Sequence, residues 1–216
     1  MPLRKRIAAE DSYGILFVLI IFSLTATAAV GSSAVGRALV VVLQGGVLLY
    51  ALWTSRSGRR ALRSAAILVP VVAVVAAILS GGKSDLAAGI GPSTIAAFTL
   101  TAIVAIARRV AAYPRVDRVT ILAALSVYLL IGTFFAAVFN AVAAFSSTQF
   151  FTTGSGRLVD YLYFSFVTLT TTGYGDMAAR TDLGRMLAVT EALLGQLYLV
   201  SVVAVVVGNL GRDRRS

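Results

Sequence analysis

The segment Tyr161-Leu-Tyr-Phe-Ser-Phe-Val-Thr-Leu-Thr-Thr-Thr-Gly-Tyr-Gly-Asp176 decides the fold. It opens with apolar and aromatic residues and closes on two glycines, Gly173 and Gly175. Long apolar runs flank it, at Val119–Phe145 and at Leu183–Leu210. A bilayer tolerates irregular backbone only where protein buries it or where it lines a water-filled path. A glycine-rich segment between two apolar runs therefore predicts a pore lining.

The composition of the whole chain is that of a membrane protein. Of its 216 residues, 58% are hydrophobic and 13% are charged, against about 45–50% and about 25% in soluble domains. Six apolar runs approach the length of about 20 residues that crosses a bilayer: Tyr13–Val30, Val35–Trp53, Ala65–Ser80, Leu86–Ala107, Val119–Phe145 and Leu183–Leu210. The stretch Leu158–Leu169 is too short to span and predicts a re-entrant helix.

The basic residues predict the orientation of the spans. With six spans, most of the 19 Lys and Arg residues fall on one side of the membrane. Because this bias marks the cytoplasmic side, both termini should be cytoplasmic. The net charge of +10 is thus a topology signal beside anionic lipid, and we expect no nucleic acid partner. The cytoplasmic set is Arg4, Lys5, Arg6, Arg56, Arg59, Arg60, Arg63, Arg108, Arg109, Arg115, Arg118, Arg212, Arg214 and Arg215.

Two other readings of the composition are weaker. The chain has no Cys and no His, which excludes disulfides, thiolate nucleophiles and His-dependent acid–base chemistry, so we do not expect an enzyme. A cleaved signal peptide is the alternative for the N-terminus. Glu10 and Asp11 interrupt its charge pattern, and its apolar run exceeds the usual 7–15 residues.

The residue types of the glycine-rich segment suit a dehydrated cation. Rings of backbone carbonyls can replace its hydration shell, and Gly173 and Gly175 can reach the positive φ that aims successive carbonyls inward. Thr171 adds a hydroxyl acceptor. Tyr174 can point away from the axis and brace the loop on aromatic neighbours. Asp176 would form a negative ring at the outer mouth.

At this point the sequence resembles the tetrameric potassium channels, whose pore signature is T-x-G-Y-G-D. Here it reads Thr171-Thr172-Gly173-Tyr174-Gly175-Asp176. The resemblance covers about Val119–Leu210 and implies a homotetramer, because each chain brings one filter segment. It also implies permeant K⁺ ions at the carbonyls of Thr171, Thr172, Gly173 and Tyr174, with support from Gly175 and Asp176.

Further residues extend the resemblance or depart from it. Gly195 stands where related channels place a hinge glycine, although close packing is the alternative. Thr172 stands where many relatives have Val or Ile, and it keeps the β-branch. Val167 replaces a Glu that pairs with the filter Asp in some relatives. We therefore expect Tyr163 to contact Asp176 instead.

Glu191 is a carboxylate deep in a predicted span, where an ionisable group is costly and marks function by default. Asn140 lies at comparable depth in the fifth run. We expect the two side chains to face each other behind the short helix and to support the filter, with Glu191 protonated. Attraction of ions by a pore-lining Glu191 is the alternative.

The front half lacks the features of a voltage sensor. Leu86–Ala107 contains no Lys or Arg, and only Arg108 and Arg109 follow it. A sensor needs several charges within the field, each worth about 2.3 kcal/mol per 100 mV. We therefore expect no steep voltage dependence. The first four spans are a lipid-facing scaffold or, alternatively, a modulatory domain that responds to lipid or stretch.

The sequence thus predicts an all-α membrane protein with six transmembrane helices, a re-entrant pore helix and a selectivity filter. Its parts are a cytoplasmic segment (1–12), a four-helix domain (13–112), a pore domain (113–210) and a short cytoplasmic tail (211–216), with no attached cytosolic ligand-binding domain. We expect passive K⁺ conduction across the plasma membrane, and the abundance of Arg suggests a bacterial origin. A potassium transporter subunit and a non-conducting scaffold are the competing functions.

Overall fold

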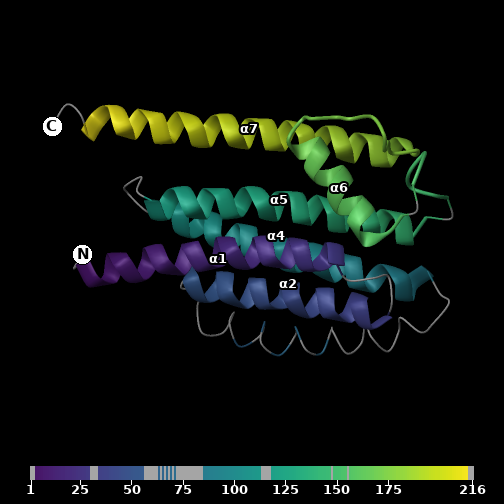
Figure 1. The fold of residues 1–216 in the computed structure, drawn as a ribbon, viewed down its shortest axis with the longest axis horizontal. Helices are drawn as coiled ribbons and strands as arrows, with labels where there is room; N and C mark the ends of the chain where they lie inside the picture. Colours follow the sequence, from purple (N-terminus) through teal and green to yellow (C-terminus); the bar gives the residue numbers. More distant parts are fainter. Residues whose placement is uncertain are drawn as a thin grey trace.

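The computed structural model is helical almost throughout. It describes residues 3–29, 34–55, 63, 65, 67, 69, 71, 85–112, 118–146, 148–154 and 156–213. The helices are α1 (Leu3–Ala29), α2 (Ala34–Thr54), α4 (Asp85–Ala111), α5 (Arg118–Ala144), α6 (Leu158–Leu169) and α7 (Asp182–Asp213) (Figure 1).

Four of these helices are long and apolar enough to cross a membrane. Their apolar parts are Ser12–Ala29, Ala88–Ala111, Arg118–Ala144 and Asp182–Val205. The predicted run Val35–Trp53 falls within α2. The predicted run Ala65–Ser80 lies outside the described residues, apart from four alternate helical positions between 65 and 71. The part of the chain that the structure describes therefore has four candidate spans, and the count of six stays a prediction.

Several threonine hydroxyls inside the long helices donate to carbonyls of their own helix. The hydroxyl of Thr99 donates to the carbonyl of Ile95 at 2.7 Å, and that of Thr133 donates to the carbonyl of Leu129 at 2.9 Å. Such bonds let Thr enter an apolar surrounding without an unpaired group. Pro92 lies inside α4, which runs on through it.

The helix α5 is the centre of the arrangement. It packs against α1, α4, α6 and α7, and Figure 1 shows α7 on one side of it and α1 and α2 on the other. The short α6 fills the space between α5 and α7 at one end of the bundle, and α1 begins and α7 ends at the other. The predicted division at residue 112 is not visible as a gap, because α4 and α5 pack along their length.

Two apolar clusters make up the core. The larger joins α1, α2, α4 and α5. The smaller is largely aromatic, joins α5, α6 and the loops around α6, and includes Phe135, Phe139, Phe150, Phe151, Tyr161 and Phe164. In contrast, α7 leaves large apolar side chains such as Leu193 and Leu197 exposed. An apolar surface of this size suits lipid or another protein chain.

Candidate functional site

The N-terminus of α6 is fixed by an ion pair with its own first turn. The backbone N–H of Arg157 donates to Asp160 Oδ2 at 2.9 Å, and the Arg157 guanidinium lies 3.3 Å from Asp160 Oδ1. A carboxylate in the first turn also interacts favourably with the helix dipole. The start of α6 is therefore well defined although it has no Ser or Thr cap.

Aromatic packing holds α6 against α5. The ring of Phe164 lies 5.1 Å from that of Phe139 and 5.4 Å from that of Phe151, both edge-on. Phe166 approaches the backbone of α5 at Gly132, where a Cβ would lie 2.8 Å from the ring. A glycine at this place lets the two helices come close, so the position of α6 follows from the shape of α5.

The chain turns sharply at the end of α6. The N–H of Thr171 donates to the carbonyl of Thr168 at 2.9 Å, and the N–H of Thr172 donates to the carbonyl of Val167 at 2.9 Å. These bonds satisfy carbonyls that a helix leaves open at its C-terminus. They also attach the following segment directly to α6.

The backbone of residues 171–176 alternates in hand. The φ angles of Thr171, Gly173 and Gly175 are +55°, +55° and +79°, and every residue of this segment is exposed. When every second residue has the opposite hand, successive peptide planes tilt alike and their carbonyls gather on one side. The structure thus has the positive φ expected at both glycines, and it adds Thr171, the one non-glycine residue with positive φ among those described.

The outer end of this segment rests on α6. The hydroxyl of Tyr163 donates to Asp176 Oδ2 at 2.8 Å, so the contact that we expected from spacing is present. The hydrogen bond raises the pKa of Tyr163 above its usual range. The ring of Tyr174 stacks on that of Tyr163, with 6.4 Å between centroids and 8° between planes. The hydroxyl of Thr153 donates to the carbonyl of Asp176 at 2.6 Å.

Backbone pairing joins the loop before α6 to the strand-like segment after Asp176. The N–H of Thr152 donates to the carbonyl of Ala178 at 2.9 Å, and the N–H of Arg180 donates to the carbonyl of Phe150 at 2.8 Å. Both ends of the 171–176 segment are therefore anchored within one chain, while the space around the Cβ positions of Gly173 and Gly175 is open.

Comparison with known proteins agrees with this geometry. Residues 119–211 match the sequence model of a family described as "Ion channel", which covers α5, α6, the 171–176 segment and nearly all of α7. A protein of Methanocaldococcus jannaschii named "Probable potassium channel protein 2" is 50% identical over 52 residues, which are 21% of this chain and 15% of that protein. Residues 119–211 thus form an ion channel domain, and part of the chain is similar to a potassium channel protein. The alignment thus spans less than a sixth of that relative's length.

Glu191 does not meet the partner predicted for it. Its side chain is fully buried, and Oε1 contacts the hydroxyl of Ser165 on α6. Ser165 in turn lies 2.7 Å from the carbonyl of Gly132 on α5. The expected pairing of Glu191 with Asn140 is wrong, because Asn140 lies eight residues along α5 from Gly132, roughly 12 Å at 1.5 Å per residue.

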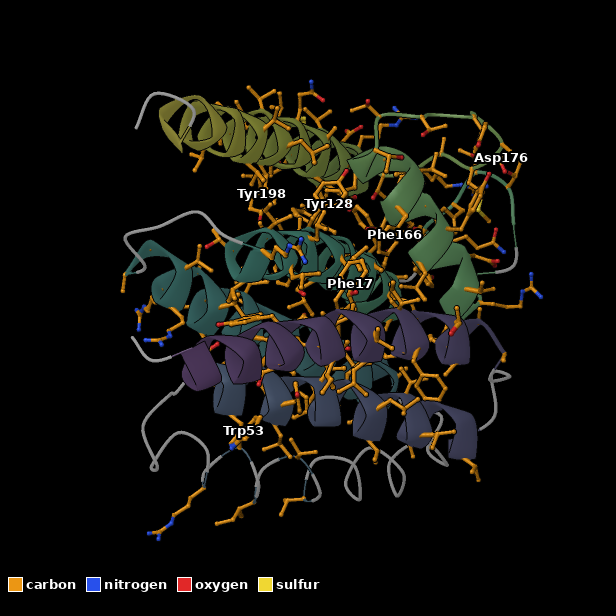
Figure 2. All side chains as sticks on the ribbon, turned by 60° about the vertical axis from the view of Figure 1, so that its left-hand side comes forward. Phe17, Trp53, Tyr128, Phe166, Asp176 and Tyr198 are labelled. Atoms are coloured by element: carbon orange, nitrogen blue, oxygen red, sulfur yellow. The ribbon has the colours of Figure 1, made fainter. Side chains whose placement is uncertain are left out.

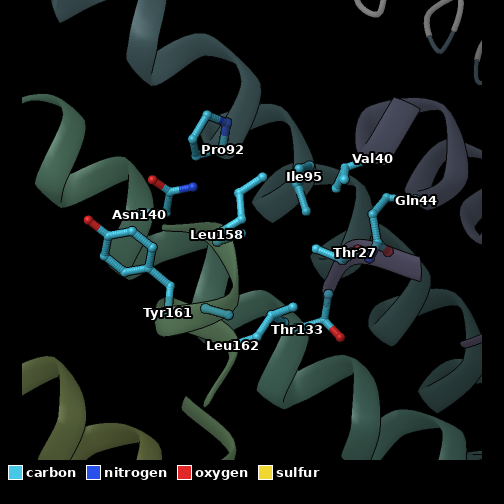
Figure 3. Close-up of a pocket in the computed structure, with 12 residues that line it drawn as sticks. Thr27, Val40, Gln44, Pro92, Ile95, Thr133, Asn140, Leu158, Tyr161 and Leu162 are labelled. Atoms are coloured by element: carbon cyan, nitrogen blue, oxygen red, sulfur yellow. The ribbon is translucent and has the colours of Figure 1, made fainter. Parts of the chain in front are cut away.

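Asn140 instead lines a small cavity on the other side of α5. The cavity, of about 30 Å³, lies between α1, α2, α4, α5 and α6 (Figure 3). Gln44, Thr133 and Tyr161 also line it. Asn140 therefore faces this cavity, which no described residue of α7 lines, and it does not meet Glu191.

Close packing surrounds Gly195. A Cβ at this position would lie 2.6 Å from the side chain and 2.8 Å from the carbonyl oxygen of Leu169, the last residue of α6. The contact between Gly195 and Leu169 therefore supports the alternative that this glycine allows close packing of α7 on α6. The structure leaves the hinge role untested, and α7 runs through Gly195 as a continuous helix.

Two tyrosines, Tyr128 on α5 and Tyr198 on α7, connect these two helices. The sequence did not single them out. Their rings stack between α5 and α7 with 6.1 Å between centroids (Figure 2). Tyr198 donates to the carbonyl of Ala124 at 2.7 Å, and Tyr128 donates to that of Leu169 at 3.3 Å. A tyrosine in an apolar span needs a partner for its hydroxyl, which is the signal that could have drawn attention to both.

Proposed function

We propose that four copies of this channel form a potassium-selective pore that conducts K⁺ passively. The alternating backbone of Thr171, Gly173 and Gly175 carries the proposal. Within a T-x-G-Y-G-D motif, such a backbone can present consecutive carbonyls to a dehydrated cation. The potassium sites are the carbonyls of Thr171 to Tyr174 with the Thr171 hydroxyl, and K⁺ is the permeant ion.

The exposure of these residues supports the proposed tetramer. Tyr174 is 70% exposed in the single chain, and one chain supplies only one side of an ion's coordination shell. Further copies complete the ring and cover the apolar faces of α7. In that ring α6 is a re-entrant pore helix whose C-terminal dipole favours a cation in the cavity below, and Asp176 attracts cations to the outer mouth.

The proposed topology has six spans in the plasma membrane, with both termini cytoplasmic. In its support, α1 begins and α7 ends at the same end of the bundle, opposite α6 (Figure 1). Arg108 and Arg109, the basic residues of the last turn of α4, belong to the cytoplasmic side.

Potassium flux from liposomes tests the proposal. The purified protein should release K⁺ down its gradient, with little Na⁺ flux and with block by Ba²⁺, and its mass in detergent should equal four chains. Equal fluxes of Na⁺ and K⁺ would contradict it. Flux that requires an energised partner protein would favour a transporter subunit, and an intact tetramer without flux would favour a scaffold.

A further inference from the structure

A buried polar cluster joins α5, α6 and α7. It consists of the Gly132 carbonyl, the Ser165 hydroxyl and the Glu191 carboxyl group. The side chains of Ser165 and Glu191 are both fully buried. Glu191 Oε2 has no hydrogen-bond partner among the described residues. The cluster is therefore shielded from water, and few hydrogen-bond donors are available to its oxygen atoms.

Counting the protons of these donors determines the state of the acid. The Gly132 carbonyl only accepts, and Ser165 has one hydroxyl proton. Ser165 Oγ lies within hydrogen-bond distance of both the Gly132 carbonyl and Glu191 Oε1. Its one proton serves only one of these contacts, and because the carbonyl cannot donate, the second proton has to come from the carboxyl group. If Ser165 donated to an ionised Glu191 instead, two acceptor oxygens would face each other at Gly132.

The surroundings of Glu191 also disfavour an ionised carboxylate. The described ion pairs are Arg157 with Asp160 and Arg185 with Asp182, and neither involves Glu191. A buried carboxylate without a countercharge and with one unpaired oxygen is strongly destabilising. A titratable side chain that interacts with Glu191 is Tyr128 on α5, a phenol whose hydroxyl donates to the Leu169 carbonyl.

We propose that Glu191 is a neutral acid that donates to Ser165, and that this relay through Ser165 to Gly132 positions α6 and the attached filter. The inference rests on the proposed function for its link to the filter.

The relay can position α6 because it fixes the register between α6 and α7. Glu191 meets Ser165, and one turn further along both helices Gly195 meets Leu169. Leu169 is followed within two residues by Thr171, where the alternating backbone begins. A slip of α6 against α7 therefore moves the filter, and the relay resists that slip.

Infrared spectroscopy of the purified channel in lipid nanodiscs tests the neutral acid directly. The C=O stretching band of a protonated carboxylic acid should be present at neutral pH and absent from Glu191→Gln. It should shift in Ser165→Ala, which removes the acceptor of its proton. A spectrum without this band, or an unchanged band in Glu191→Gln, overturns the proposal. This measurement does not require conduction, so it is independent of the proposed function.

Flux measurements test the positioning role. Glu191→Gln keeps a donor of the same length, so K⁺ flux should stay within about twofold of the parent, whereas Ser165→Ala should lower the ratio of K⁺ to Na⁺ flux about tenfold. Ser126→Ala is the matched control, because Ser126 is equally buried but donates within its own helix to Leu122. If Glu191→Gln and Ser165→Ala lowered the ratio of K⁺ to Na⁺ flux equally, the positioning role would be overturned. A parent protein without any K⁺ flux would refute the proposed function instead.

Discussion

At the scale of single residues, the filter segment depends on backbone conformations that side chains disfavour. Thr171 has a φ of +55°, a left-handed value that costs an L-residue about 1–2 kcal/mol. Such strain persists only where surrounding bonds hold it, and here the N–H of Thr171 is tied to the Thr168 carbonyl. The hydroxyl of Thr171 offers a benefit that glycine lacks, since it adds an acceptor at the same site.

The conformation of Gly173 can be tested without any steric conflict. A Cβ at Gly173 meets nothing within 4 Å in the single chain, but its φ is +55°. Gly173→Ala should therefore lower K⁺ flux from liposomes at least about tenfold, because a strain of about 1–2 kcal/mol falls on the residue that aims a carbonyl. Gly46→Ala is the control, since Gly46 also has open space around its Cβ position and lies inside α2. Equal flux in the two variants would argue against the alternating backbone as the conducting element.

The hydrogen bond between Tyr163 and Asp176 can be tested by its pH dependence. Tyr163→Phe keeps the stacking on Tyr174 and should lower thermal stability only slightly, because water reaches this hydrogen bond. Because the bond raises the pKa of Tyr163 in the folded state, its contribution is complete below the unfolded tyrosine pKa of about 10. The contribution is lost as pH rises through the higher folded value.

Thermal melts of the parent and of Tyr163→Phe should thus differ at neutral pH and converge in strong alkali. Asp176→Asn combined with Tyr163→Phe completes a double-mutant cycle. A difference between the two melts that stays constant up to strong alkali would contradict the assignment of the hydrogen bond.

At the scale of elements, the apolar pattern predicts the apolar parts of the helices well, but it does not predict how far a helix continues beyond them. The bounds Leu158–Leu169 of α6 are those expected, because the apolar stretch ends where the glycine-rich segment begins. The helix α1 instead begins at Leu3, ten residues before the predicted run, since charged residues can continue a helix outside the apolar region.

Depth along a helix does not determine the direction in which a side chain points. Asn140 and Glu191 lie at comparable depth, yet Glu191 contacts Ser165 whereas Asn140 lines the cavity with Gln44 and Thr133. The expected contact of Tyr163 with Asp176 is present because the 171–176 segment runs back along α6. The sequence predicts positive φ angles at the two glycines but not at Thr171. Thr171 has a positive φ because its N–H is bonded to the Thr168 carbonyl at the end of α6.

The packing of α7 on α6 predicts the effect of a methyl group at Gly195. Gly195→Ala would bring its Cβ within 2.8 Å of the Leu169 carbonyl oxygen, and backbone cannot yield as a side chain does. We expect a loss of about 1–3 kcal/mol, measured as lower thermal stability of the purified protein. Gly91→Ala, a helical position with open space around its Cβ, should change stability little. A stable Gly195→Ala variant would show that α6 and α7 are further apart.

At the scale of the whole molecule, the described helices α1 and α4 pack on α5, and α2 packs on both of them. The helix α4 carries its basic residues only in its last turn, and it packs extensively against α5. A rigid apolar contact of this kind suits a scaffold in the lipid. It also suits a sensor of tension, since bilayer forces on α1, α2 and α4 would reach α5 directly.

The gating charge per subunit tests the prediction that the protein has no steep voltage dependence. Patch recordings of the reconstituted channel between −100 and +100 mV should show an open probability that changes less than about tenfold. One charge crossing the whole field would already contribute about 2.3 kcal/mol per 100 mV. Replacing Arg108 and Arg109 by Gln should leave this dependence unaltered. Several elementary charges per subunit would refute the prediction.

The attachments of α7 on both sides of Gly195 have a consequence for how the channel could open. Glu191 ties the helix to Ser165 above the glycine, and Tyr198 ties it to Ala124 below. A bend centred on Gly195 would have to break one of these ties, so the lever that swings during opening should start after Tyr198. Spin labels placed before that tyrosine would then keep their mutual spacing in every conductance state, while labels placed beyond it would spread apart.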